Sequence, residues 1–237
     1  MLQAVLFDLD GTLLPMDHKV FLSEYLKELF LLVQPVIEPA VFKRAFMAST
    51  SAMATNNSPD LTNEEVFWRD FQVQLGDQLP VVRPLLEEFY NERFPQLAYV
   101  ASPCPEARIL VKAAMQHDLR IVLATNPLFP RTAILSRMSW AGVHDLPWDL
   151  ITSYEVMHFC KPHLEYYREI VAQLGVRPEE CLMVGNDVDQ DLIAGSLGMK
   201  IYMVTDCLRG DLAGICRADW HGTIQQLAGL WENNGVI

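Results

Sequence analysis

Short apolar runs alternate with longer amphipathic segments through most of the chain. Each run is too short for a helix, has β-branched residues along it or at its centre, and ends in a polar residue. These features predict buried strands over residues 4–8, 121–126, 181–186 and 200–206.

Apolar residues between these strands recur at helical spacing, which predicts helices over residues 105–117, 130–141, 163–174 and 188–197. Alternation of buried strands with such helices is typical of a parallel sheet covered on both faces. The pattern therefore predicts an α/β fold with a doubly wound parallel sheet.

Residues 16–100 depart from this alternation. Apolar spacing near three and four predicts successive helices there, over 19–33, 38–50, 63–75 and 81–94, with no convincing strand. Thr62 followed by Glu65 fits a capping box at the start of the third helix. We therefore expect an α/β core formed by residues 1–15 and 101–237, with an inserted all-helical domain formed by residues 16–100.

Charge and composition narrow the classes of partner. The formal net charge of −12 disfavours nucleic acid and anionic membrane surfaces as partners, because both would be repelled. We expect no transmembrane segment and no signal peptide, and the five cysteines form no C-x-x-C pair. These features favour a cytoplasmic protein, and a monomer and a homodimer are both compatible with them.

Polar side chains follow the predicted strands at the edge of the sheet where ligands bind in such folds. Asp8 and Asp10 follow the first strand, Thr125 and Asn126 end the second, and Asn186, Asp187 and Asp191 follow the third. Lys161 precedes the helix that leads into the third strand. Clustered carboxylates favour a divalent cation, and oxygen ligands favour Mg²⁺ over zinc. A lysine and a hydroxyl beside that metal favour an anion, phosphate above all.

Four motifs in the same order as these residues resemble the haloacid dehalogenase superfamily of phosphohydrolases. They are "DLDGTLL" at residue 8, Thr125 in "VLATN", Lys161 in "KPHLEYY", and "MVGNDVDQD". The run "KPHLEYYREIVAQLGVRPEECLMVGN" also resembles the phosphoglycolate-phosphatase-like branch. In that family, a helical bundle inserted after the first motif is a mobile C1-type cap, so the resemblance implies hinges near 14–18 and 99–103.

The resemblance also implies roles for individual residues. Asp8 would be the nucleophile that forms an aspartyl-phosphate, and Asp10 the general acid and then the general base. Thr125, Asn126 and Lys161 would bind the substrate, with Thr125 and Lys161 on the phosphoryl oxygens. The implied magnesium ligands are Asp8, Asp10 through its backbone carbonyl, Asn186, Asp187 and Asp191.

One position departs from the family pattern. Many relatives carry Asp where this chain has Asn186 in "GNDVDQD". Either the amide oxygen of Asn186 binds the metal or Asp187 takes over as ligand, with Asp191 in support, and the sequence leaves this choice open.

The function implied is a Mg²⁺-dependent phosphatase acting on a small phosphorylated substrate. Asp10 favours a phosphate ester or anhydride, while a sugar phosphomutase would carry the same residue. A third alternative is a catalytically weak protein that binds a phosphorylated ligand, for which Asn186 is the one sequence indication. In the insertion we expect Phe67, Trp68 and Phe71 to form core, and a substrate-reading group could lie among Lys43, Arg44, Arg69 and Arg93.

Overall fold

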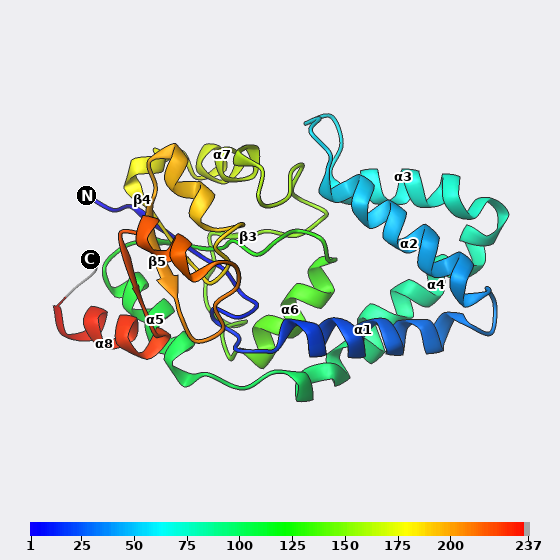
Figure 1. Ribbon diagram of the computed structural model, residues 1–237, viewed down its shortest axis with the longest axis horizontal. Helices are drawn as coiled ribbons and strands as arrows, with labels where there is room; N and C mark the ends of the chain where they lie inside the picture. Colours follow the sequence, from blue (N-terminus) through cyan, green and yellow to red (C-terminus); the bar gives the residue numbers. More distant parts are fainter. Residues whose placement is uncertain (235–237) are drawn as a thin grey trace.

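The computed structural model describes residues 1–234, and its strands form one six-stranded parallel sheet (Figure 1). The strand order is β3-β2-β1-β4-β5-β6, with every neighbouring pair parallel. The strands are β1 (Ala4–Phe7), β2 (Arg120–Leu123), β3 (Leu150–Ile151), β4 (Cys181–Gly185), β5 (Lys200–Val204) and β6 (Trp220–Gly222). The predicted doubly wound parallel sheet is confirmed, although β3 and β6 are too short to give a sequence pattern.

Both faces of the sheet are buried because successive residues of β1 enter different apolar clusters. Val5 and Phe7 pack with α5 (Pro105–Gln116), α6 (Arg131–Trp140) and α8 (Ile224–Asn234). Ala4 and Leu6 pack with α7 (Leu164–Leu174) on the opposite face. All four strand residues are fully buried, which explains why β1 reads as an uninterrupted apolar run.

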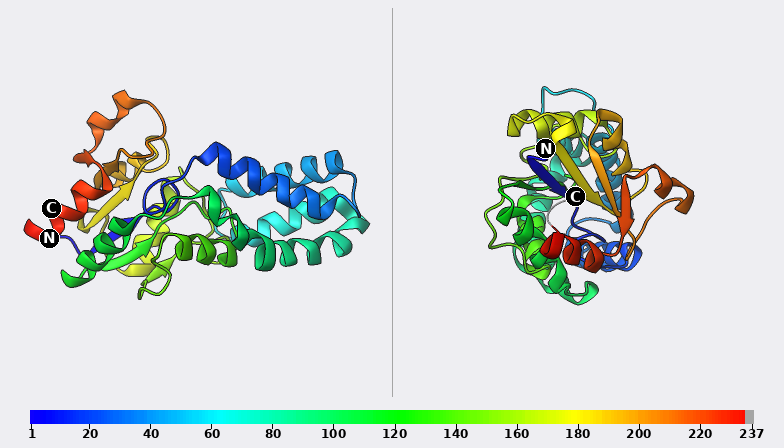
Figure 2. Two further views of the ribbon diagram at one scale, coloured as in Figure 1. Left: turned by 90° about the horizontal axis from the view of Figure 1, so that it is seen from below. Right: turned by 90° about the vertical axis from the view of Figure 1, so that its left-hand side faces the viewer.

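The remaining helices lie between β1 and α5 in the chain and extend away from the sheet (Figures 1 and 2). They are α1 (His18–Val33), α2 (Pro39–Ala54), α3 (Asn63–Leu75) and α4 (Leu79–Glu88). The Thr62–Glu65 capping box at the start of α3 is present as expected. No helix within residues 1–234 is long and apolar enough to cross a membrane.

Two predicted helices are wrong in part. The helix expected over 81–94 ends at Glu88 and continues as a π-helical turn (Phe89–Arg93) and a 3₁₀ helix (Phe94–Val100). Pro95 has no N–H to donate to an α-helical hydrogen bond there. The helix expected over 188–197 is a turn followed by a 3₁₀ helix (Leu192–Leu197).

Side-chain hydrogen bonds explain the second error. The Asp187 carboxylate accepts hydrogen bonds from the backbone N–H groups of Asp189 and Gln190, both at 3.0 Å. The Asp191 carboxylate accepts from the backbone N–H of Asp187 at 3.0 Å. Short acidic side chains that bind nearby backbone donors compete with helix formation. Further 3₁₀ segments are Gly76–Gln78, Pro178–Glu180 and Leu212–Arg217.

Backbone contacts attach the helical segment, residues 16–100, to the rest of the chain at three places. Its two ends are neighbours, because Met16 forms an isolated bridge with Ala101 and the N–H of Ser102 donates to Pro15 at 2.9 Å. The third attachment is the start of α3, where the N–H of Asn63 donates to the carbonyl of Met157 at 2.8 Å. The expected hinges therefore lie side by side, and their mobility stays a prediction.

Asn63 strengthens this third attachment with its own side chain. It is fully buried, and its amide donates to the carbonyls of Pro127 and Phe159 at 3.5 and 3.4 Å. The adjacent N–H of Glu64 donates to the carbonyl of Tyr154 at 2.8 Å. The first turn of α3 thus contacts the loops that follow β2 and precede α7.

The apolar core is continuous between the sheet and the helical segment. Phe21 of α1 contacts Phe94 and Phe129, and Phe94 stacks on Trp140 of α6 with ring centroids 5.5 Å apart. Farther along the segment, Phe67 and Phe71 are buried and Trp68 packs against the same core, as expected. The segment therefore shares one core with the face of the sheet that α5 covers.

Phe71→Ala tests this core against Val73→Ala on the same helix. Phe71 is fully buried and Val73 is 80% exposed. We expect Phe71→Ala to lower the free energy of unfolding by about 3–5 kcal/mol, because it leaves a cavity. Val73→Ala should change it by less than about 0.5 kcal/mol. Urea unfolding measures both, and equal losses would contradict the assignment of Phe71 to the core.

Candidate active site

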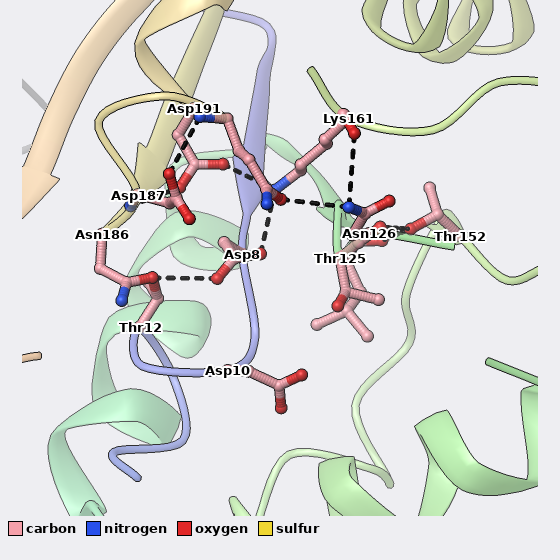
Figure 3. Close-up of polar contacts among 12 residues, drawn as sticks. Asp8, Asp10, Thr12, Thr125, Asn126, Thr152, Lys161, Asn186, Asp187 and Asp191 are labelled. Atoms are coloured by element: carbon pink, nitrogen blue, oxygen red, sulfur yellow. Dashed lines mark hydrogen bonds and ion pairs between the residues drawn. The ribbon is translucent and has the colours of Figure 1, made fainter. Parts of the chain in front are cut away.

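A buried lysine joins two carboxylates at the carboxyl edge of the sheet (Figure 3). The N–H of Asp8 donates to Val184 of β4 at 2.9 Å, which fixes Asp8 just beyond β1. Lys161, in the loop before α7, donates through Nζ to Asp8 Oδ1 at 2.9 Å and to Asp191 Oδ1 at 2.7 Å. The side chains of Lys161 and Asp191 are each 1% exposed, and that of Asp8 is 12% exposed.

Burial and the neighbouring opposite charges have opposing effects on the pKa values of Asp8 and Lys161. Burial, together with the negative charge of Asp191, raises the pKa of Asp8 to about 7 against the lowering effect of Lys161. Burial alone would lower the pKa of Lys161, but Asp191 and Asp8 hold it well above its usual range. Lys161 is therefore a fixed positive charge, and a further cation beside Asp8 would favour the ionised carboxylate.

Asn186 presents its amide oxygen toward Asp8. The amide nitrogen donates to the carbonyl of Cys207 at 2.6 Å, so the oxygen faces the other way. The Thr12 hydroxyl lies 3.0 Å from that oxygen and 3.3 Å from Asp8 Oδ2. Gly11 permits this packing, because a Cβ there would lie 2.2 Å from the Asn186 nitrogen and its φ is +90°.

Asp191 and Asp187 are both committed to other partners. Asp191 uses one carboxylate oxygen for Lys161 and the other for the N–H of Asp187. Asp187 caps the following turn with one oxygen, and its other oxygen lies 3.3 Å from Arg209 Nη1. Asp191 therefore positions Lys161 and the turn, while Asp187 lies nearer the solvent.

Asp10 lies apart from this group (Figure 3). It pairs with a different cation. Its Oδ2 accepts a hydrogen bond from Arg137 of α6. Arg137 was not predicted as a site residue, although its position in the sequence carries a signal. Arg137 shares the apolar stripe of α6 with Ala133, Ile134 and Met138, where a charged residue is unexpected.

Thr125 and Asn126 are held by a network behind them. The carbonyl of Thr125 accepts hydrogen bonds from the hydroxyls of Thr152 and Tyr166, each at 2.8 Å. The Asn126 amide donates to Gln190 Oε1 at 3.1 Å and to the carbonyl of Lys161 at 3.4 Å. Thr152 and Tyr166 were not singled out from the sequence, because nothing in their local pattern distinguishes them from ordinary core residues.

These residues line a cavity of about 120 Å³. Every sequence-predicted site residue lines it except Lys161, which is bonded to Asp8. The helical segment contributes His18, at the start of α1, whereas Lys43, Arg44, Arg69 and Arg93 do not line this cavity. Arg137, Arg209, Phe129, Leu128 and Gln190 complete its wall.

The oxygen atoms near Asp8 suit magnesium. Within the described part of the chain, no three Asp, Glu, His or Cys side chains gather as a metal-binding cluster. Lys161 bonds to both Asp8 and Asp191, and Asp10 pairs with Arg137. Mg²⁺ commonly binds through one or two carboxylates together with water and a substrate phosphate. Asp8 and the amide oxygen of Asn186, on either side of the Thr12 hydroxyl, fit that requirement.

Comparisons with known proteins bear on the family and on the fold of the chain. The family model described as haloacid dehalogenase-like hydrolase matches residues 2–197. YhcW of Bacillus subtilis, provisionally named a phosphatase, is 26% identical over 218 residues, which are 90% of this chain and 87% of YhcW. Glyceraldehyde 3-phosphate phosphatase of Methanothermobacter thermautotrophicus is 34% identical over 64 residues, 27% of this chain and 28% of that protein. The structure of a HAD phosphatase from Thermococcus onnurineus has a similar fold, with a TM-score of 0.60 over 99% of each chain at 21% identity.

Gly185→Ala tests how tightly Asp191 is placed. A Cβ at residue 185 would lie 2.2 Å from Asp191 Oδ2, so the Asp191 carboxylate must shift, and we expect the shift to break its pairing with Lys161. Breaking such a buried pair costs about 3 kcal/mol, which lowers the melting temperature by roughly 6–12 °C. The matched control is Gly195→Ala, whose Cβ would make an ordinary 3.5 Å contact with Ile201. Equal melting temperatures for the two variants would contradict this account.

Proposed function

Because the chain belongs to the haloacid dehalogenase-like hydrolases, we propose that it is a Mg²⁺-dependent phosphatase that hydrolyses a small phosphate monoester by way of a phosphorylated Asp8. The observation that carries this proposal is the buried Lys161 bonded to both Asp8 and Asp191. It provides a fixed positive charge beside a carboxylate that borders a cavity.

In the first step, a carboxylate oxygen of Asp8 attacks the phosphorus and the bond from phosphorus to the leaving oxygen breaks. Lys161, which the Asp191 carboxylate holds in place, offsets the charge of Asp8 and of the phosphoryl oxygens. Thr125, whose backbone Thr152 and Tyr166 fix, borders the same cavity and would bind a phosphoryl oxygen. Positioning and charge compensation are what phosphoryl transfer requires.

Asp10 handles the protons. Asp10 lines the cavity, and its Oδ1 has no hydrogen-bond partner within residues 1–234, so that oxygen is free to serve a substrate. It gives a proton to the leaving oxygen in the first step. In the second step it takes a proton from the water that cleaves the phosphoaspartate and releases inorganic phosphate.

Magnesium would be held by Asp8, by the amide oxygen of Asn186 and by the backbone carbonyl of Asp10, where it would neutralise charge on the transferring group. Thr12 fixes the side chains of Asp8 and Asn186 relative to each other through its hydroxyl. The geometry favours Asn186 over Asp187 as the direct ligand, because Asp187 is committed to the following turn and to Arg209.

The main test is phosphate release from small phosphate monoesters and from p-nitrophenyl phosphate, with Mg²⁺ or with a chelator. Asp8→Asn should lower turnover by roughly a thousandfold or more, because the nucleophile is lost. Asp189→Asn, an exposed neighbour of the site, should keep the parent rate. Parent-level turnover by Asp8→Asn would refute the proposed nucleophile. A phosphomutase would instead move phosphate within the substrate and release none.

Asn186→Ala and Asp187→Asn together test the choice of ligand. We expect Asn186→Ala to raise the Mg²⁺ concentration needed for half-maximal activity by roughly tenfold or more, since a metal contact is lost. Asp187→Asn keeps a cap acceptor and should raise that concentration less. Calorimetric titration with Mg²⁺ checks both variants without turnover, and the reverse order would make Asp187 the ligand.

A further inference from the structure

Arg137 is an arginine almost completely removed from water. Its side chain is 1% exposed, and its guanidinium lies over the ring of Phe129, 4.5 Å from the ring centroid. Nε donates to the carbonyl of Ala133 at 3.4 Å, and Nη1 donates to Asp10. Burying a guanidinium is unfavourable unless its donors are satisfied.

The donors of Arg137 are not all satisfied. Its Nη2 is buried without a hydrogen-bond partner among residues 1–234, and so is Oδ1 of Asp10. Seven buried side-chain atoms of the described residues share this condition, and four of them belong to residues that line the 120 Å³ cavity. The other two of these four are His18 Nδ1 and Asn126 Oδ1. Such atoms are rare in proteins, so their gathering at one cavity indicates a polar ligand.

Chemistry limits what the partner of Nη2 can be. A guanidinium only donates hydrogen bonds, so the partner must carry an acceptor, which in a small organic phosphate is an oxygen. In the proposed mechanism Lys161 and Thr125 bind the phosphoryl group and Asp10 serves the leaving oxygen. Arg137 bonds to Asp10 and lines the same cavity, so a leaving group that reaches Asp10 lies near the unpaired donor of Arg137.

We propose that Arg137 determines substrate specificity by donating a hydrogen bond from Nη2 to a second oxygen, a hydroxyl or a carboxylate, of a short leaving group. This proposal rests on the proposed phosphatase function. It assigns recognition to a helix that covers the sheet, rather than to the basic residues of the helical segment. The contact with Phe129 and the Nε bond to Ala133 hold the guanidinium in one orientation, which makes it selective.

Three two-carbon esters test this assignment, since they differ only at the second carbon: ethyl phosphate, 2-hydroxyethyl phosphate and phosphoglycolate. We expect the unmodified protein to hydrolyse at least one oxygen-bearing ester with a kcat/KM roughly tenfold or more above that for ethyl phosphate. Preference for 2-hydroxyethyl phosphate identifies a hydroxyl acceptor, and preference for phosphoglycolate identifies a carboxylate. Magnesium-dependent hydrolysis of p-nitrophenyl phosphate without such preference would overturn the proposal and leave the phosphatase function standing.

The variants Arg137→Met and Arg137→Lys test whether Arg137 recognises the leaving group or only positions Asp10. Either change also disturbs Asp10, so all three rates should fall, and the readout is their ratio. We expect Arg137→Met to abolish the preference for the oxygen-bearing ester and Arg137→Lys to retain part of it. An equal fall for the three esters would overturn the proposal, because it would show that Arg137 only positions Asp10.

Arg209→Met is the matched control, since Arg209 lines the same cavity but is 41% exposed and pairs with Asp187. Arg209→Met should keep the ratio of the rates for the oxygen-bearing ester and ethyl phosphate. Loss of this ratio in Arg209→Met but not in Arg137→Met would overturn the proposal. Calorimetry of the three esters on Asp8→Asn, with and without Arg137→Met, measures the same preference in binding. If the unmodified protein hydrolyses no ester, the phosphatase function fails. In that case the calorimetry still tests Arg137, because equal affinities of Asp8→Asn for the three esters would overturn its role in recognition.

Discussion

The ammonium group of Lys161 is buried, and two carboxylates from different parts of the chain, those of Asp8 and Asp191, pair with it there. Neither carboxylate would be stable at that depth alone, and neither would the ammonium, because each would be a charge without a partner. The backbone around them is shaped accordingly. Gly185 leaves room for Asp191, and the N–H of Asp187 holds its second oxygen. These ion pairs thus join three parts of the chain: the end of β1, the turn after β4 and the loop before α7.

Much of this arrangement could be predicted because it follows from the geometry of parallel sheets. The carboxyl ends of neighbouring strands meet at one edge, so Asp8, Thr125 and Asn186 had to lie close together. The pairing of Asp10 with Arg137 could not be predicted in this way. It joins residues 127 positions apart, and Arg137 occupies an apolar stripe whose usual residue is aliphatic. The turn at Asp187 was also mispredicted, because helical spacing does not show that a carboxylate will bind backbone donors instead.

The helical segment contributes to the site less through charge than through packing. His18 is its one residue on the cavity wall, and Phe21 of the same helix contacts Phe129 beside Arg137. Basic side chains farther along the segment lie away from this cavity. The segment therefore shapes the apolar surroundings of Arg137, and these surroundings strengthen every charged contact by excluding water.

The three attachments of the helical segment also limit how the cavity can open. Two adjacent connections, at Met16 and Ala101, define an axis about which a segment can rotate. The third, at Asn63, lies away from these two, so a rotation of the segment about them would break it. Swinging the segment outward would break the Asn63 contact with Phe159, two residues before Lys161. An outward movement of the segment that admits a ligand would then be coupled to the loop that carries Lys161.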